Sequence, residues 1–591
     1  MTPTPQDAFF FHSPGTGDRL RIGLLLDSYV QPAWVYRILA QIAASDFCCF
    51  AVIVRNGLPA PAPPPGGRWL RRLRLFTNPE IRKHLLYTAY LRFDNRFNPI
   101  PPEDDPFTPI DCASLLTGVP ELTQAPKAGK FTHRFSGEDV AAVQAHKPDV
   151  LLRFGFNIIR GPMLTAARYG MWSFHHGDND VYRGGPAHFW EIVERSPVTG
   201  VLLQVLSEEL DGGLVLAKGV VSTEQGISLR RNRRNPYWAG SPYVIRKLWE
   251  LHTRGWESLQ ANQVPNRPTE NAKKIYRRPV NGQVLRFLTK PLLQKAVRGV
   301  MQRLTGGAVG KSGAMDEWRV AVRRGGQPLW DAPAGAAAEF HWMKAPAGRF
   351  FADPFLLPDP DGGAPWLLME DYRTEGNKGV LACAQLNPDR PGSFQQEPAT
   401  ILERPFHLSY PHAFVEDGVY YMTPEMGANR AVELYRAPHP AGPWEKDCAL
   451  LTGVHAVDPT VWREGERWWM LVTLWSYGKS ASELWLFTAD RLRGPWLPEQ
   501  PGPVSLDVRH SRPGGAVYIT GGRRFRISQD CSVTYGYRIG RHEITGLGAG
   551  GYQEQPAGEL VETLFPGCRG IHTYNRLGEW EVIDGKFGWM W

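Results

Sequence analysis

The sequence predicts a multidomain protein in which a Rossmann-like α/β domain is followed by an all-β propeller of five blades. The chain has 591 residues, which is more than one hydrophobic core usually supports. Near the N-terminus, buried apolar runs alternate with an amphipathic segment, the pattern of a parallel sheet. In the last part of the chain, short β-rich runs recur between Gly and Pro turns at a spacing of roughly 50 residues, as in propellers.

The first domain is predicted over residues 19–264. Leu20–Leu26 has the composition of a buried strand, Ala33–Ala44 that of an amphipathic helix, and Phe50–Arg55 that of the next strand. A strand, a helix and a strand in this order imply two parallel strands joined by a crossover. We therefore expect an open α/β sheet, whose ligands bind beyond the carboxyl ends of its strands.

A basic connector is predicted over residues 265–335. Within it, residues 284–304 place Leu, Ala and Val on one face of a helix and Lys and Arg around the rest. One interpretation is that this helix packs against a neighbouring domain, and the other is that it contacts an anionic membrane surface. The N-terminus lacks a basic signal-peptide start, and no run approaches about 20 apolar residues. We expect a cytoplasmic protein, at most peripheral at the inner face of the membrane.

Composition narrows the possible partners only slightly. The sequence is 42% hydrophobic and 21% charged, which is typical of a globular protein. Its formal charge of +8 suits nucleic acid, anionic lipid or nucleotide-sugar phosphates alike. Seven cysteines without a Cys-x-x-Cys pair argue against a disulfide framework or a zinc ribbon, and favour a reducing compartment. With the motifs described next, we expect a sugar substrate, not a nucleic acid.

The propeller is predicted over residues 336–591, where Gly442-Pro443-Trp444 recurs as Gly494-Pro495-Trp496. The predicted blade starts are Asp353-Pro354-Phe355, Tyr410-Pro411-His412, Asp458-Pro459-Thr460, Arg512-Pro513-Gly514 and Gly570-Ile571-His572. The innermost strands of a propeller line its central funnel, so one side chain from each start is expected to face a ligand there. These side chains are Asp353, His412, Asp458, Arg512 and His572.

A set of landmarks in the first domain carries a family signature. The landmarks are Ser173 and His175, then Tyr182-Arg183-Gly184, then Thr199-Gly200-Val201, and finally Asp211. Residues 147–218 resemble the formyltransferases that use 10-formyltetrahydrofolate, among them the methionyl-tRNA and nucleotide-amino-sugar formyltransferases. The resemblance implies a catalytic Asn-x-His pair with a distant Asp, and it implies 10-formyltetrahydrofolate as the formyl donor.

The chemistry of formyl transfer explains these residue types. The reaction passes through a tetrahedral intermediate whose oxyanion needs a hydrogen-bond donor, and the attacking amine must lose a proton. The resemblance implies that His175 transfers the proton and that Asp211 orients the His175 ring. It also implies that Arg183 and Gly184 bind substrate. Ser173 stands where the family has Asn, so its hydroxyl is a shorter donor at this position.

The loop after His175 is unusually polar. His176, Asp178 and Asp180 suggest either a metal site or a solvated loop. Because no second set of ligands accompanies them, we favour the loop and predict no metal.

A second resemblance covers residues 351–584. The phrases that carry it are Ala352-Asp353-Pro354-Phe355, Ser409-Tyr410-Pro411-His412, Pro424-Glu425, Asp458-Pro459, Ser528-Gln529-Asp530-Cys531 and His572-Thr573-Tyr574-Asn575. They resemble five-bladed arabinanase and xylosidase-type glycosidases, and more closely the glycosidase-like N-terminal domain of glucosamine inositolphosphorylceramide transferases. The resemblance implies that Asp353 is a catalytic base and that Asp458 tunes it.

The catalytic acid of such glycosidases has no counterpart at the expected place, because Arg512 stands there. The Arg fork suits a phosphate or carboxylate. Glu370 and Glu425 each lie at the end of a second strand and are candidate acids from other blades. Glu370, Glu425, His412 and His572 are also candidate substrate ligands.

Together, these motifs predict a formyl transferase-like enzyme that acts on an amino sugar in surface glycan or glycolipid biosynthesis, with a propeller that binds or processes the glycan. The expected substrate is a nucleotide-linked or lipid-linked sugar. One alternative is a glycosidase-like or glycosyl-transfer enzyme that uses the propeller funnel and keeps the first domain as a scaffold. Another is a non-catalytic glycan-binding scaffold.

Overall fold

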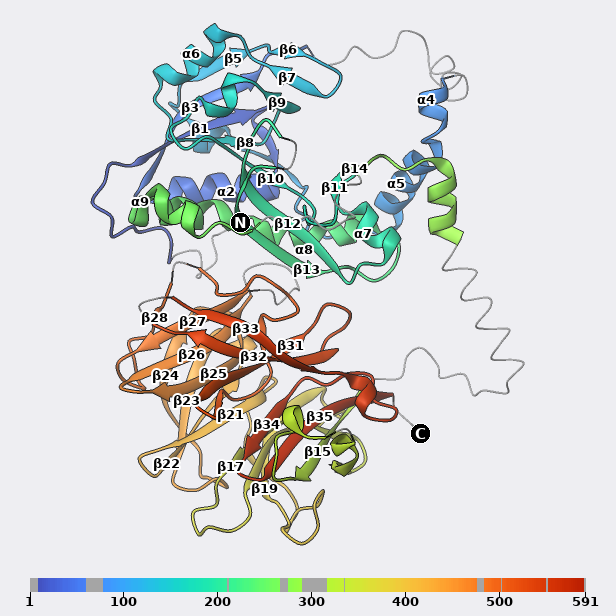
Figure 1. Ribbon diagram of the computed structural model, residues 1–591, viewed down its shortest axis with the longest axis vertical. Helices are drawn as coiled ribbons and strands as arrows, with labels where there is room; N and C mark the ends of the chain where they lie inside the picture. The colour runs from blue at the N-terminus through green and yellow to red at the C-terminus, as the bar shows by residue number, and fades with distance from the viewer. Residues whose placement is uncertain are drawn as a thin grey trace. The chain divides into compact units, whose positions relative to one another are not determined.

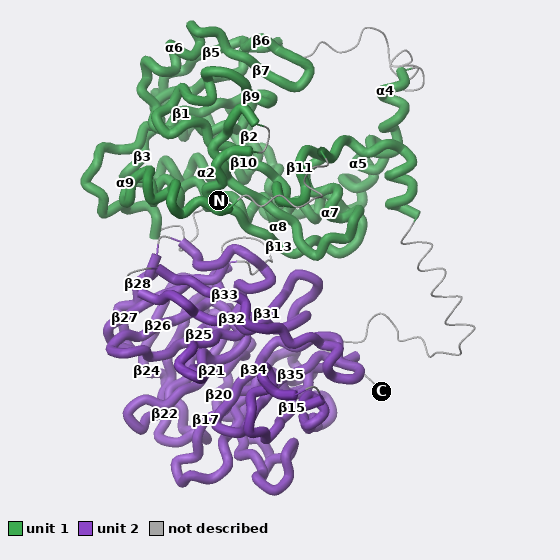
Figure 2. The backbone as a smooth tube through the Cα atoms, viewed as in Figure 1, with its two compact units in different colours: residues 1–309 green, residues 310–591 purple. Residues whose placement is uncertain are grey.

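The computed structural model divides the chain into two compact units, residues 1–309 and 310–591 (Figure 2). It describes residues 9–59, 78–209, 212–265, 275–289, 316–333, 335–475, 483–500, 502–548 and 551–588. Within these ranges no helix is both long and apolar enough to cross a bilayer.

A seven-stranded sheet forms the centre of the first unit (Figure 1). Its order across the sheet is β13 (Leu214–Ser222), β12 (Val198–Val205), β10 (Met171–His175), β8 (Val150–Arg153), β1 (Leu20–Leu26), β3 (Cys48–Asn56) and β5 (Glu121–Gln124). The strands from β10 to β5 run parallel, whereas β12 and β13 are antiparallel. Parallel strands with both faces covered consist of continuous apolar runs, as in Leu20–Leu26, where all but Arg21 are buried.

Helices complete the first unit. The segment α2 (Ala33–Ala44) connects β2 (Val30–Pro32) to β3 and buries Trp34 and Ile38. The remaining helices are α4 (Pro79–Arg82), α5 (Leu85–Phe97), α6 (Gly137–Ala145), α7 (Phe189–Glu194), α8 (Leu229–Gly240) and α9 (Tyr243–Ala261). The α/β class predicted from the first segments is confirmed, since β1 and β3 pair in parallel around α2.

The connector expected over residues 265–335 does not form a separate body. Residues 281–289 are helical, and their Val284 and Phe287 pack in a core cluster with Tyr90 of α5 and Phe189 of α7. The rest of the helix predicted over 284–304 lies outside the described residues. At the other end, β15 (Asp316–Arg324) pairs along its whole length with β35 (Trp580–Gly588), so it belongs to the second unit. This pairing joins distant segments, which local sequence patterns do not reveal.

The second unit consists of antiparallel sheets that follow one another along the chain. Four of them are β17 (Arg349–Leu357) to β20 (Ala399–Leu402), β21 (Ser409–Glu416) to β24 (Glu445–Thr452), β25 (Ala456–Glu464) to β28 (Leu497–Pro498), and β29 (Arg512–Pro513) to β33 (Gln553–Leu560). The fifth combines β15 and β16 (His341–Trp342) from before the first sheet with β34 (Tyr574–Leu577) and β35 from the chain's end.

The innermost strands of successive sheets contact one another in sequence. Strand β17 packs against β21, β21 against β25, and β25 against β29. The series returns to its start because Tyr574 N–H donates to Gly514 O at 2.9 Å, and β17 also contacts β34 and β35. Sheets arranged in this way leave few free edges, and the mixed fifth sheet joins the two ends of the unit.

The innermost strands also share a backbone irregularity. Asp353, Tyr410 and Asp458 have φ values of 49°, 44° and 52°, and each precedes a proline. The pairing register shifts at each of these points. A non-glycine residue in the left-handed region costs roughly 1–2 kcal/mol, so three repeats of the same bulge indicate that the surrounding packing enforces it. The bulges re-aim the side chains that begin each strand.

Candidate functional site

The first candidate site lies at the carboxyl end of the parallel sheet. Ser173 and His175 both belong to β10, and because they are two residues apart on a strand they face the same side. Open α/β sheets bind their ligands at this edge. The third predicted member, Asp211, lies outside the described residues.

Ser173 is one of three polar side chains in a row across the sheet. On one side, Arg153 at the end of β8 donates from Nε to Ser173 Oγ at 3.1 Å, while its Nη1 donates to Phe156 O. On the other side, Gln204 of β12 pairs directly with Ser173, and its buried Oε1 has no hydrogen-bond partner among the described residues. Sequence analysis missed both flanking residues. The signal was a polar residue at the end of the apolar strand β8 and another near the end of β12.

His175 is oriented by the loop that follows it. Its Nε2 lies 3.2 Å from Tyr182 O. A carbonyl can only accept, so Nε2 carries the proton, and the lone pair of the neutral ring is on Nδ1. A Cβ at Gly177 would lie 3.1 Å from both Nε2 and Tyr182 O, so glycine makes this contact possible. The arrangement leaves Nδ1 as the basic atom of the imidazole.

Glu191 is a buried carboxylic acid that sequence analysis did not single out. It lies on α7, is 1% exposed, and its Oε1 has no hydrogen-bond partner among the described residues. Burial raises its pKa to about 7, against the opposing charge of His175 nearby. A carboxyl group that titrates near neutrality beside a histidine can exchange protons with it.

The predicted substrate residues Arg183 and Gly184 form β11, which pairs with Ile275 and Tyr276 of β14 (Ile275–Tyr276). Gly184 has a φ of 91°, and a Cβ there would lie 2.4 Å from Tyr276 O. Glycine is thus required by the close approach of the two backbones. Nothing in these contacts tests their predicted role in substrate binding.

The polar loop after His175 is held by an ion-pair network. Lys218 Nζ lies 2.5 Å from Asp178 and 2.6 Å from Asp180, whereas His176 stacks on Tyr237 at 3.8 Å between ring centroids. The two carboxylates are therefore neutralised by a lysine, and His176 points elsewhere. The preferred interpretation as a solvated loop needs correction, because these side chains are only partly exposed and are paired.

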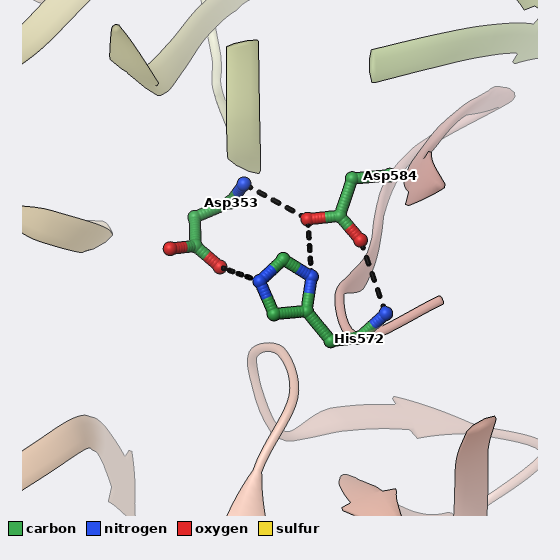
Figure 3. A group of neighbouring side chains, drawn as sticks. All are labelled: Asp353, His572 and Asp584. Carbon is green, nitrogen blue, oxygen red and sulfur yellow. Dashed lines mark hydrogen bonds and ion pairs between the residues drawn. The ribbon is translucent and has the colours of Figure 1, made fainter. Parts of the chain in front are cut away.

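The second candidate site contains most of the side chains predicted to meet at the centre of the second unit. His572 lies between two carboxylates, with Nε2 3.3 Å from Asp353 Oδ1 and Nδ1 2.6 Å from Asp584 Oδ2 (Figure 3). Asp353 Oδ1 also accepts from Thr573 Oγ1 at 2.9 Å. Strand β17 supplies Asp353, and β35 supplies Asp584, so the group joins the first sheet to the last.

Asp584 was not predicted, although it holds this group together. Its Oδ1 accepts from the backbone N–H groups of His572 and Thr573 at 3.1 and 3.0 Å, and its Oδ2 accepts from that of Asp353 at 3.0 Å. Burial alone lowers the pKa of His572, but the charges of Asp584 and Asp353 outweigh it and raise that pKa above its ordinary value. The two aspartates consequently favour the imidazolium form of His572.

Arg512 is paired with protein carboxylates. It contacts Asp458 through Nε, and its Nη2 lies 3.3 Å from Glu425 Oε2. Gln529 Nε2 donates to Asp458 Oδ2 at 2.8 Å, while the buried Oε1 of Gln529 lacks a hydrogen-bond partner within the described part of the chain. The guanidinium expected to take a ligand phosphate or carboxylate is already occupied by Asp458 and Glu425.

His412 differs from the other predicted members. Its Nδ1 lies 3.3 Å from Thr423 Oγ1, and its ring packs against Phe355. Burial lowers its pKa to about 3, so it is neutral. The residue equivalent to Asp353 in this sheet is Tyr410, whose N–H donates to Asp353 Oδ2 at 3.1 Å. The role of His412 in substrate binding stays a prediction.

The centre holds more acids than bases. Its carboxyl groups are Asp353, Glu370, Glu425, Asp458 and Asp584, and its cations are Arg512 and His572. Burial raises the pKa of Asp353 to about 6, although His572 acts in the opposite direction. Burial, followed by the charges of neighbouring carboxylates, raises the pKa of Glu370 and of Glu425 well above the ordinary range. These two groups favour their protonated forms because they are buried and because other carboxylates lie nearby.

Within the described part of the chain, one group of side chains has atoms close enough to ligate a metal, namely Asp353, His572 and Asp584. Their ligand atoms are already used on one another and on backbone N–H groups. A cation there would have to replace the imidazolium proton of His572, so the arrangement fits a hydrogen-bonded triad better than a metal centre.

Both halves of the chain are similar to known proteins. The family described as "Glucosamine inositolphosphorylceramide transferase 1, N-terminal" matches residues 332–567. A glucosamine inositolphosphorylceramide transferase 1 of Oryza sativa subsp. japonica is 27% identical over 248 residues, which are 41% of this chain and 32% of that protein. A methionyl-tRNA formyltransferase of Chlorobium limicola is 29% identical over 125 residues, which are 21% of this chain and 37% of that protein.

The two resemblances expected from the motifs are therefore confirmed: a formyltransferase-like part is fused to a glycosidase-like propeller part. The chain spans about a third of the length of these curated relatives.

Two solved structures are similar to parts of this chain at low scores. Glycinamide ribonucleotide transformylase 1 from Symbiobacterium toebii is 17% identical, with a TM-score of 0.26 over 45% of this chain and 94% of that chain. A thermostable family-43 glycoside hydrolase is 13% identical, with a TM-score of 0.28 over 35% of this chain and 74% of that chain. The fold assignment rests on the strand order described above.

Replacing Glu191 should change how stability depends on pH. The folded state favours protonated Glu191, so this group stabilises the fold fully below about pH 4.5, and the contribution is lost as the pH rises through about 7. Glu191→Gln stays neutral and should gain roughly 1–3 kcal/mol relative to wild type between these limits. Urea unfolding followed by tryptophan fluorescence measures this. Exposed Glu138→Gln is the matched control, and a gain that shrinks with rising pH would contradict the assignment.

Replacing Asp584 should weaken the second unit most at low pH. Asp584→Asn leaves the His572 imidazolium with one fewer charge partner and should cost about 3–5 kcal/mol near pH 6. Stability from a raised histidine pKa is present below its unfolded value and is lost as the pH rises through the folded value. The difference from wild type should therefore shrink as the pH rises above the raised pKa of His572. Unfolding measurements test this against exposed Asp389→Asn, and a difference that grows with pH would overturn it.

Proposed function

We propose that this chain is an acyl transferase that moves a formyl group to the amine of an amino sugar, and that the centre of its second unit binds an amino-sugar unit of the same acceptor. On this proposal the five sheets are blades around one binding centre. The acceptor belongs to glycolipid or surface-glycan biosynthesis. The seven free cysteines support a reducing, cytoplasmic location.

The observation that carries the proposal is the polar row of Arg153, Ser173 and Gln204 beside His175. Formyl transfer needs a donor for the developing oxyanion, and the substitution of the family's Asn by Ser173 weakens that donor. Arg153, in direct contact with Ser173, brings a charged donor to the same place. Arg153 therefore supplies the oxyanion donor that the replacement of Asn by Ser173 would otherwise remove.

The reaction assigns one task to each of these side chains. The neutral amine attacks the formyl carbon, a C–N bond to the acceptor forms, and the C–N bond to the donor breaks. Arg153 and Ser173 stabilise the oxyanion, and the free Oε1 of Gln204 accepts an N–H of the attacking amine. His175 takes the amine proton at Nδ1 and returns it to the departing nitrogen.

10-Formyltetrahydrofolate supplies the formyl group when it is bound. The residues present fit such a donor, because a cationic N–H and a hydroxyl adjoin a histidine at the ligand-binding edge of the sheet. Arg153, Ser173 and His175 are the side chains that would hold its formyl group.

The charge of the second centre supports an amino sugar as its ligand. Five carboxyl groups face two cations, which is an excess of acids, and burial followed by the charges of neighbouring carboxylates raises the pKa of Glu370 and of Glu425. A sugar ammonium would relieve this excess, and the unpartnered Oε1 of Gln529 offers an acceptor to a hydroxyl or ammonium. The similarity to proteins named glucosamine inositolphosphorylceramide transferases supports the same choice of sugar and a lipid-linked acceptor.

Glycosidase chemistry in this centre is the weaker alternative. Asp353 has the raised pKa of an acid, and Glu370 lies within range of its charge. However, the position of the usual acid is held by Arg512, which pairs with Asp458 and Glu425. These contacts favour binding of the sugar over its hydrolysis.

Arg153→Met should lower formyl transfer by about 100- to 1000-fold, because it removes the charged oxyanion donor. His175→Ala should abolish transfer, whereas Ser173→Asn should retain or raise it. The assay follows product mass with 10-formyltetrahydrofolate and a panel of nucleotide-linked and lipid-linked amino sugars. Exposed Arg168→Met is the control. If wild type and Ser173→Asn neither bind folate nor form product, the first unit is a scaffold and the proposal fails.

The second centre should bind glucosamine more tightly than N-acetylglucosamine or glucose, since only glucosamine carries an ammonium group. Asp353→Asn should weaken glucosamine binding at pH 8 by about tenfold or more and leave glucose binding unchanged, because Asp353, with a pKa of about 6, is ionised there. Calorimetric titration of the full chain tests this, with exposed Glu466→Gln as the control. Equal affinity for the three sugars would remove the ammonium argument, and release of a monosaccharide from a glycan would favour the glycosidase alternative.

A further inference from the structure

An apolar stripe is exposed along the outer side of α5. Leu86, Phe93 and Phe97 are 39%, 52% and 64% exposed, and their spacing places them on one face of the helix. The rings of Phe93 and Phe97 lie 4.6 Å apart. Neighbouring elements add Ile81, Val280 and Leu285, which are 40%, 41% and 55% exposed. We call these six residues the α5 surface.

Hydrogen bonds fix the parts of the α5 surface to one another. Asn281, at the start of helix 281–289, accepts from Leu86 N–H at 2.9 Å and donates from Nδ2 to Arg82 O at 2.7 Å. Its own N–H donates to Lys83 O at 2.8 Å. Beneath, Phe287 packs on Tyr90. The junction of α4 and α5 and the helix 281–289 are therefore held against one another, and Figure 1 shows these helices adjoining.

The charges around the α5 surface have one sign. Residues 78–98 and 275–289 contain seven basic side chains: Arg82, Lys83, Arg92, Arg96, Arg277, Arg278 and Arg286. The only acids in these two stretches are Glu80, which pairs with Lys83 at 2.6 Å, and Asp94, which is buried. Arg92 and Arg96 flank the phenylalanine stripe along one side. The α5 surface therefore consists of exposed aromatic and aliphatic side chains bordered by arginines.

We propose that the α5 surface binds an anionic lipid bilayer. Phenylalanine and leucine side chains on such a face enter the boundary between headgroups and acyl chains, and the flanking arginines reach the lipid phosphates. Each basic side chain near an anionic membrane contributes about 1 kcal/mol. A second copy of this chain is a poor occupant, because a two-fold contact would bring Arg92 and Arg96 against their own equivalents.

The inference goes beyond the proposed reaction and does not depend on it. It places the protein at a membrane, where an enzyme and its lipid-linked acceptor both diffuse in the plane of the bilayer. It also relocates the membrane contact considered for residues 284–304, because the described apolar face is built mainly by α5.

The test is flotation of the full chain with phosphatidylcholine vesicles that either contain or lack phosphatidylserine. Wild type should float with the anionic vesicles only, and binding should fall as salt is added. The double variants Phe93→Ser with Phe97→Ser, and Arg92→Gln with Arg96→Gln, should each lower the partition coefficient by at least about tenfold. Phe131→Ser is a matched control, since Phe131 is also 64% exposed, and Arg254→Gln is the control for charge.

Three outcomes would overturn the inference. Wild type that fails to bind anionic vesicles at low salt would do so, as would equal binding by all variants. A chain whose concentration-dependent dimerisation is abolished by Phe93→Ser with Phe97→Ser would show that another copy covers the surface. Unchanged thermal unfolding and unchanged formyl transfer to soluble acceptors would show that a loss of flotation reflects the surface alone. If formyl transfer is absent throughout, the flotation result still stands.

Discussion

The second unit depends on one buried carboxylate, Asp584. It accepts from three backbone N–H groups and pairs with the ring of His572, and these donors come from the innermost strand of the first sheet and from the last sheet. The residues it joins are distant in the chain, so the interaction closes the series of sheets at the point where the β15 and β35 strands also meet. Removing a partner from a buried ion pair costs more than the pair itself contributes. The binding centre and the closure of the unit therefore share the same side chains.

Sequence patterns predicted the parts whose causes are local. Leu20–Leu26 and Ala33–Ala44 have the apolar spacing of their elements, and the structure gives both the same bounds. Ser173 and His175 were found because a short motif places them on one strand. The residues that complete their site, Arg153 and Gln204, come from neighbouring strands, and only the pairing register brings them beside Ser173. A single sequence does not contain that register.

The predictions that failed involve contacts between distant segments or unusual backbone. Residues 316–324 were assigned to a connector because their partner strand is at the end of the chain. The residue of the second sheet that matches Asp353 is Tyr410, because the left-handed bulge falls there, whereas the sequence pattern selects His412 two residues later. The substrate role of His412 stays a prediction. Arg512 was correctly placed among the acids, yet its pairing with Asp458 and Glu425 was not foreseeable from residue type alone.

The two proposed sites require opposite charge states of the same chemical group. An acidic centre binds an amine as its ammonium ion, whereas only the neutral amine has the lone pair that attacks a formyl carbon. Formylation then converts the amine into a neutral amide, which an acidic centre no longer attracts. On the proposed function, the reaction removes the charge that recruits the acceptor, so the product is expected to leave more readily than the substrate. Carboxyl groups that already hold protons make this release easier, because Glu370 and Glu425 can stay neutral once the cation has gone.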